Sequence, residues 1–339
     1  MNMKRRRNYA VPVFSFLAMM VLILDSKTAL SGAKDGVELC LYSVIPSLFP
    51  FFIFSVLLTS SLSGKNIKFL HPLGRLCGMP RGSESILVIG FLGGYPVGAQ
   101  AIANAYEFDQ ISKETAHRLL GFCSNAGPAF LFGMLGAQFS SRTVPWVLWT
   151  IHIASALIVG MLLPGKDTDC CVLRSGQQIT FPQAVERSLR TMANVCGWVI
   201  IFRVIIAVLN RWVMWLLPQA GQVLLSGILE LSNGCISLQY LPLQGSRFIF
   251  AASMLSLGGL CVAMQTATAV GNMGTGMYFP GKILQCFISI LLSCVAQPLL
   301  FNPSDCISVP PAICIGTLLA GAALIFYMYR RKKVVAICT

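Results

Sequence analysis

Four apolar stretches of the sequence are interrupted by glycine, proline and polar residues. Glycine and proline interrupt the i to i−4 hydrogen bonding of a helix, which frees carbonyls for cations and leaves half-helix N-termini for anions. Neighbouring hydroxyl and amide side chains can then contact a polar solute. The alternative is that these residues serve close helix packing. The candidate substrate-binding residues at these interruptions are Gly94, Tyr95, Pro96, Gly98, Ser124, Asn125, Gly127, Glu230, Ser232, Asn233, Gly234, Gly258, Gly259 and Gln265.

Two charged residues, Glu230 and Arg203, stand in apolar surroundings. A charge at mid-membrane costs about 2.5–3.5 kcal/mol on insertion scales, so each needs a partner or a function. For Glu230 we expect contact with a substrate hydroxyl or amine, or proton transfer; the alternative is a structural ion pair. Arg203 is a further candidate substrate contact because guanidinium binds carboxylates bidentately. Its alternatives are pairing with Glu230 or extension toward Arg211.

The sequence contains no recognisable catalytic or metal-binding pattern. Its 13 cysteines are scattered without C-x-x-C spacing, and His71, His117 and His152 are far apart. A Ser-His-Asp set, paired carboxylates and a phosphate-binding loop are also missing from the sequence. We therefore expect a protein that is not an enzyme and holds no metal or cofactor. A coupling cation, sodium or a proton, stays an open alternative.

The composition is typical of a membrane protein. Only 11% of the residues are charged and 55% are hydrophobic, with a mean hydropathy of +0.73, whereas a soluble domain has about 25% charged residues. Apolar runs of about 20 residues favour membrane-spanning helices over a barrel. Part of the net charge of +13 lies beside the first and last apolar runs, at 4–7 and 330–333. Such clusters set topology and contact anionic lipid, so we expect the bilayer, and not nucleic acid, as a partner.

The apolar pattern predicts an all-α polytopic membrane protein with about eight transmembrane helices and two re-entrant helical hairpins. The hairpins are expected at 84–107 and 221–241, because each has a polar or Gly-rich break that leaves halves too short to cross a bilayer. Ser112 is expected to cap a helix at a cytoplasmic turn. The predicted spans are 9–25, 38–60, 114–140, 143–163, 188–210, 247–270, 282–300 and 309–329.

The basic residues predict that both termini are cytoplasmic. Most of the 25 Lys and Arg residues then fall on the cytoplasmic side, and Lys282, at the start of the span 282–300, is counted there. We interpret 1–339 as a single integral membrane domain. It contains a first repeat at 36–163 and a second at 184–300, joined by a cytoplasmic linker at 164–182.

The two repeats share their order of elements and a few residues, such as Glu38 with Glu186 and Phe54 with Phe202. Each repeat is expected to cross the membrane three times, so the second is inverted relative to the first. Inverted-topology repeats are typical of secondary transporters, which bind substrate where discontinuous helices of the two repeats meet. The sequence therefore favours a secondary transporter of a small polar or anionic solute.

The four interruptions together resemble sporulation integral membrane proteins of the nucleoside-recognition (Gate) domain family, which is distantly similar to concentrative nucleoside transporters. The resemblance implies movement of dipicolinic acid during endospore formation, with a small-molecule solute as partner, in the cell membrane or the outer forespore membrane. A homo-oligomer stays open. The alternative is a non-transporting membrane scaffold or signalling protein in sporulation. The motifs that carry the resemblance are Gly94-Tyr95-Pro96-x-Gly98, Cys123-Ser124-Asn125-x-Gly127-Pro128, Glu230-x-Ser232-Asn233-Gly234 and Gly258-Gly259 with Gln265.

Overall fold

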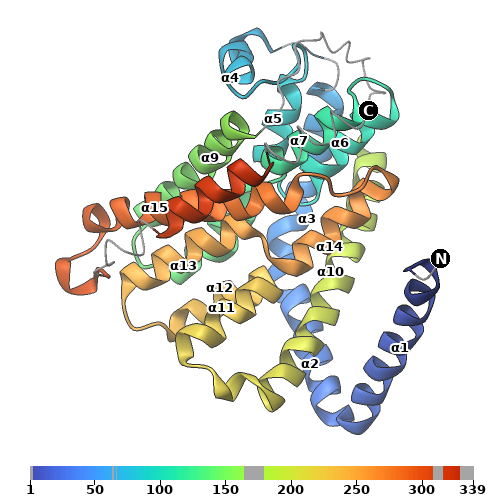
Figure 1. Cartoon of the computed structure of the whole chain (residues 1–339), viewed down its shortest axis with the longest axis vertical. Helices are drawn as coiled ribbons and strands as arrows, with labels where there is room; N and C mark the ends of the chain where they lie inside the picture. The colour runs from blue at the N-terminus through green and yellow to red at the C-terminus, as the bar shows by residue number, and fades with distance from the viewer. Residues whose placement is uncertain (1–2, 63–64, 66, 164–178, 308–315, 329–339) are drawn as a thin grey trace.

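The computed structural model describes residues 3–62, 65, 67–163, 179–307 and 316–328. Regular secondary structure in these ranges is helical throughout, and no strand occurs among them (Figure 1). Most of the predicted linker 164–182 and the basic cluster 330–333 lie outside the described residues. The predicted all-α class is confirmed for the described part of the chain.

The first half of the chain begins with helices that lead into a long, nearly continuous span. A π-helical turn at Cys40–Val44 joins two of these helices end to end. Ser112 caps a later helix as predicted, since its Oγ accepts a hydrogen bond from the Thr115 backbone N–H at 3.2 Å. The helices of this half are α1 (Met3–Leu24), α2 (Ser26–Leu39), α3 (Ile45–Leu62), α4 (His71–Leu76), α5 (Glu84–Leu92), α6 (Val97–Glu107), α7 (Lys113–Cys123), α8 (Pro128–Phe130) and α9 (Thr143–Leu162).

The second half has the same order of elements. In both halves a long helix is followed by a pair of short antiparallel helices, a helix with a non-helical break, and an unbroken helix. A further apolar helix, Gly316–Met328, follows the second half. The helices are α10 (Phe181–Trp212), α11 (Gln219–Leu229), α12 (Leu231–Ser237), α13 (Gln244–Leu257), α14 (Gly259–Val270) and α15 (Tyr278–Leu300).

Six helical segments of the described chain are long and apolar enough to cross a membrane. They coincide with six of the spans expected from the sequence. The first and last expected spans coincide with shorter apolar helices, Ser15–Leu24 and Gly316–Met328. A polytopic membrane protein is therefore supported, while the count of eight spans stays a prediction. The six segments are 26–62, 113–138, 143–162, 181–212, 244–273 and 278–300.

Both predicted hairpins contain a helix break. The first lies at the predicted Gly-rich segment, whereas the second lies at Glu230, just before the Ser232-Asn233-Gly234 segment expected to break it, which is helical in α12. Helix α5 ends at Leu92 and α6 begins at Val97; α11 ends at Leu229 and α12 begins at Leu231. In each hairpin the two arms pack against each other. The local cause is the same in both: a polar or Gly-rich break interrupts the helical hydrogen bonding, and the chain turns back on itself.

The long helical segment of the first half, α2 with α3, packs beside the long helix α10 of the second half and so joins the halves. Helix α10 runs along α2 and α3 (Figure 1). Small residues allow this approach, since a Cβ on Gly32 would lie 2.7 Å from the Cβ of Ala207. At one end, the Asp25 carboxylate accepts a hydrogen bond from the Trp212 indole at 3.0 Å and lies 3.3 Å from Nε of Arg211. This packed pair forms one wall beside the broken elements.

Candidate functional site

One cavity lies where the broken elements of the two halves meet. Its volume is about 50 Å³, and it is partly open to the outside. Helices α3 and α10 contribute an apolar wall that includes Phe52 and Val199. The polar or backbone-exposing residues that line the cavity come from all four predicted interruptions: Gly93, Gly94 and Tyr95, Ala126 and Gly127, Glu230 and Ser232, and Gln265. The structure thus brings together elements that are far apart in the sequence.

The first hairpin tip is held by close backbone packing. Gly94 has a positive φ of 70°, and a Cβ there would lie 2.9 Å from the backbone nitrogen of Gly127. An L-residue would be strained by both the φ value and the contact. The tip therefore depends on the absence of a side chain at both positions. It presents Tyr95 to the cavity.

The second hairpin tip is organised by the carboxylate of Glu230. This residue is 2% exposed, and it forms the N-cap of α12. Its Oε1 accepts a hydrogen bond from the Ser232 N–H at 2.9 Å, and its Oε2 accepts one from the Asn233 N–H at 2.6 Å. A carboxylate at a helix N-terminus is stabilised by these N–H groups and by the helix dipole. Part of the cost of the buried charge is offset locally.

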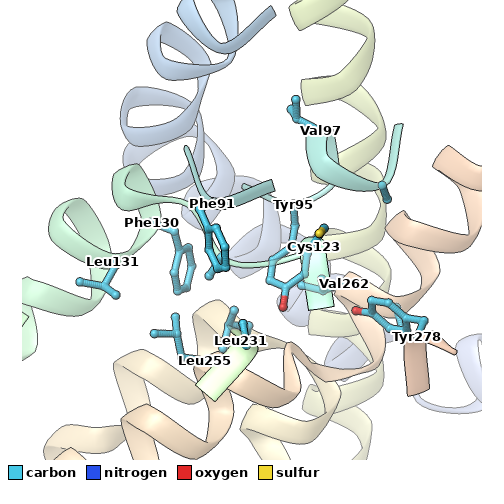
Figure 2. Close-up of a cluster of buried hydrophobic side chains, with 14 of the residues drawn as sticks. Phe91, Tyr95, Val97, Cys123, Phe130, Leu131, Leu231, Leu255, Val262 and Tyr278 are labelled. Carbon is cyan, nitrogen blue, oxygen red and sulfur yellow. The ribbon is translucent and has the colours of Figure 1, made fainter. Parts of the chain in front are cut away.

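The broken helix of the second half lies beside both tips. Gly258 and Gly259 each have a φ of +79°, which explains the break between α13 and α14. A Cβ on Gly258 would lie 3.2 Å from the Tyr95 hydroxyl oxygen. Figure 2 shows this hydroxyl pointing toward the segments that carry Leu231 and Val262. The first-half tip therefore meets both second-half breaks.

Asn125 lies behind the cavity wall in a buried polar cluster. Its Nδ2 donates to the Phe122 carbonyl at 2.6 Å, while its Oδ1 accepts from Nζ of Lys282 and Nε2 of Gln285, both at 3.1 Å. Gln285 Nε2 also donates to the His152 carbonyl at 3.2 Å. The cluster connects the break after α7 with α9 and α15. The sequence alone did not indicate this group.

The structure buries Lys282. The sequence assigned this residue to the cytoplasmic side, but its side chain is 1% exposed and packs among Asn125, Gln285 and Tyr95. The reason is tertiary: α15 begins at Tyr278, so Lys282 lies a full turn inside the helix and faces the core. The other basic residues keep the membrane sides that the sequence predicts for them.

Arg203 lies outside the set of residues that line the cavity. Its guanidinium donates to Oδ1 of Asn233 and lies 3.6 Å from Oδ2 of Asp35. Within the described chain no ion pair joins Arg203 to Glu230. The arginine thus links α10 to α2 and to the second hairpin.

The predicted site residues divide into two groups. The first group lines the cavity, and the second, which includes Arg203 of α10, does not. Substrate contact stays a prediction for both. Lining the cavity are Gly94, Tyr95, Gly127, Glu230, Ser232 and Gln265. Not lining it are Pro96, Gly98, Ser124, Asn125, Asn233, Gly234, Gly258, Gly259 and Arg203.

Metal binding receives no support from the described residues, where no group of three or more His, Cys, Asp and Glu side chains could hold an ion. The Nε2 of Gln265 donates a hydrogen bond to Sγ of Cys261 at 3.4 Å. Its Oε1 is therefore available to the cavity. The arrangement is suited to noncovalent binding of a polar solute by hydroxyl, amide and backbone groups.

Comparison with known proteins finds a sporulation membrane protein. Over 278 aligned residues the chain is 26% identical to sporulation integral membrane protein YlbJ of Bacillus subtilis (strain 168). The chain is similar to YlbJ, as its motifs indicated. The match covers 72% of this chain and spans 64% of the length of YlbJ. The similarity to YlbJ and the apolar helices together support an integral, multi-pass membrane protein.

The other two comparisons give no match. No family model matches the chain, and no solved structure matches it.

Proposed function

We propose that this protein is a secondary transporter of a small polar or anionic solute. The observation that carries the proposal is the cavity between the halves, lined by residues from four broken helical elements. Irregular backbone at membrane depth is tolerated where protein or a watery cavity satisfies its polar groups. Transporters use such broken helices to bind substrate near the bilayer midplane. A scaffold has no need for a polar cavity at this position.

The proposal includes two inverted repeats, 36–163 and 184–300. Their common order of elements supports it: α2–α3 corresponds to α10, and the hairpin α5–α6 corresponds to α11–α12. Both termini are cytoplasmic, and alternating access results from movement of one set of broken elements against the other around the cavity. The hairpins are re-entrant in this arrangement, and eight spans cross the membrane.

Dipicolinic acid is the proposed solute, and the cell membrane or the outer forespore membrane is the proposed location. The name of the relative, a sporulation integral membrane protein, supports a role in endospore formation. The cavity lining offers a tyrosine hydroxyl, a serine hydroxyl and an amide, which are groups that can hydrogen-bond a small dicarboxylate. The proposed protein is not an enzyme. It is coupled to a sodium or proton gradient or, as the alternative, works as a uniporter.

Uptake by liposomes tests this function. Purified protein is reconstituted in liposomes loaded with unlabelled dipicolinate, and entry of labelled dipicolinate is compared with entry of labelled uridine. Gln265→Met removes a polar cavity residue of similar size, and Gln100→Met makes the same change on an exposed face of α6. We expect a loss of about tenfold or more in Gln265→Met, as for a lost hydrogen bond to a charged ligand, and little change in Gln100→Met.

Other results have distinct meanings. Equal uptake by wild type and Gln265→Met would show that the solute does not pass through this cavity. Uptake of uridine alone would change the solute to a nucleoside. Absence of uptake by folded protein would favour the scaffold.

A further inference from the structure

Lys282 is held in a cage of neutral groups between the halves. Its Nζ donates to Oδ1 of Asn125 at 3.1 Å and to Oε1 of Gln285 at 2.8 Å. The same Nζ lies 5.2 Å from the centroid of the Tyr95 ring. Two oxygens and an aromatic face together match the three N–H groups of an ammonium ion. The geometry therefore fits a charged lysine.

This ammonium has no carboxylate partner within the part of the chain that the structure describes. The carboxylate of Glu230 accepts hydrogen bonds from the N–H groups of Ser232 and Asn233, and Asp35 lies beside Arg203. No ion pair of Lys282 occurs among the described residues. A buried cation surrounded only by neutral dipoles is costly and attracts an anion.

Tyr95 lies between this ammonium and the cavity. Tyr95 is 9% exposed and lines the cavity. Its buried hydroxyl makes no hydrogen bond to any described residue. Figure 2 shows the hydroxyl directed away from the first-half backbone toward Leu231 and Val262 of the second half. A cation against the ring strengthens the hydroxyl as a hydrogen-bond donor. A buried donor without a partner is stabilised when a ligand supplies an acceptor.

We propose that Tyr95 and Lys282 form the carboxylate-binding pole of the substrate cavity. The Tyr95 hydroxyl donates to a carboxylate oxygen in the cavity, and the ammonium behind the ring neutralises the charge. Asn125 and Gln285 hold the lysine in place. The subsite takes a small organic carboxylate and discriminates against its neutral analogue. This inference rests on the proposed function, whose solute class it makes specific.

The polarity of the cavity follows from this assignment. The Glu230 carboxylate is tied to the second hairpin, whereas the Tyr95–Lys282 pole belongs to the first hairpin and α15. A carboxylate is therefore expected to approach the first hairpin tip, away from Glu230. The remaining part of the solute then faces Ser232 and Gln265, which offer hydroxyl and amide groups.

Binding of matched charged and neutral probes tests the pole. Calorimetry on purified protein measures pyridine-2,6-dicarboxylate and its neutral diamide for wild type, Lys282→Met, Tyr95→Phe and the exposed control Lys65→Met. In Lys282→Met we expect dicarboxylate affinity to fall about 10- to 100-fold, because a neutralising charge is lost from a low-dielectric site, with the diamide changed by less than about threefold. Tyr95→Phe weakens the dicarboxylate about 3- to 10-fold, and Lys65→Met leaves both probes unchanged.

Several outcomes would overturn the inference. Unchanged dicarboxylate affinity in Lys282→Met, or equal weakening of both probes, would make Lys282 structural while the proposed transport stands. Wild type that binds uridine but neither pyridine probe would keep a transporter and remove the carboxylate pole. Wild type that binds no solute would overturn the proposed function as well. If Lys282→Met is too unstable to assay, the isosteric Tyr95→Phe decides: unchanged dicarboxylate affinity overturns the pole.

Discussion

The irregular backbone of the two hairpin tips is stabilised in different ways. The tip between α5 and α6 carries no charged residue and relies on the contact of Gly94 with Gly127. The tip between α11 and α12 relies on Glu230, which caps its own helix through two backbone hydrogen bonds. The first hairpin tip thus relies on steric fit and the second on charge.

This difference distinguishes a residue that stabilises the cavity from a residue that is available to bind a solute. Both oxygens of Glu230 already accept hydrogen bonds, so its charge serves the second tip directly. The Tyr95 hydroxyl has no partner among the described residues, so it is available to a ligand. We therefore expect substitutions at the second tip to change stability first, and substitutions at Tyr95 to change binding first.

The largest effect is expected for Glu230→Ala. The substitution leaves the buried N–H groups of Ser232 and Asn233 without their acceptor, which costs about 2–5 kcal/mol of unfolding free energy. Denaturant unfolding in detergent measures it, with the exposed Glu186→Ala as control. A change below about 0.5 kcal/mol, the range of surface substitutions, would show that the cap does not hold the second tip.

Gly94→Ala tests the steric closure of the first tip. An alanine at this positive φ, with its Cβ 2.9 Å from the Gly127 nitrogen, should lower the unfolding free energy by about 1–3 kcal/mol. Gly197→Ala is the matched control, because a Cβ at Gly197 meets nothing within 4 Å in the middle of α10. That control should stabilise the protein by up to about 1 kcal/mol. Similar unfolding curves for both variants would contradict the account of this tip.

Tyr95→Phe should leave the stability nearly unchanged. Removal of a buried hydroxyl that has no hydrogen-bond partner releases an unsatisfied group, so the unfolding free energy should change by less than about 1 kcal/mol. The same unfolding assay measures it. A loss of more than about 2 kcal/mol would indicate that the hydroxyl is bonded in the unliganded protein, and would remove the contrast with Glu230.

The smallest effect is expected for Asp35→Asn. Asp35 is half-exposed and lies 3.6 Å from Arg203, which also binds Asn233 at the second tip. An exposed ion pair of this kind contributes about 0–1 kcal/mol. Thermal unfolding at low and high salt should therefore differ little between the variant and wild type. A large, salt-dependent loss would mean that the second tip depends on this ion pair as well as on its own cap.

The local features of the fold were predictable from the sequence. Gly94, Gly258 and the Glu230 segment interrupt apolar stretches, and glycine and polar residues at such positions favour the end of a helix. Ser112 caps α7 because an N-cap hydroxyl bonds the N–H three residues on. The expected arrangement of the repeats predicted that these breaks meet. In the structure, residues from all four line one cavity.

The features missed by the sequence are set by tertiary packing. Lys282 stands near the start of an apolar run, where a basic residue ordinarily marks a membrane boundary. Nothing local shows that the residue faces Asn125 of the first half. Likewise, Arg203 pairs with Asp35 of α2, which is far away in the sequence and is brought close by helix packing.

Counterflow of labelled dipicolinate in liposomes tests the central claim most directly. Wild-type protein should accelerate entry of the label when the liposomes are preloaded with unlabelled dipicolinate, and empty liposomes should not. Folded wild-type protein that gives no counterflow of dipicolinate or uridine would contradict a transport role and favour the non-transporting scaffold.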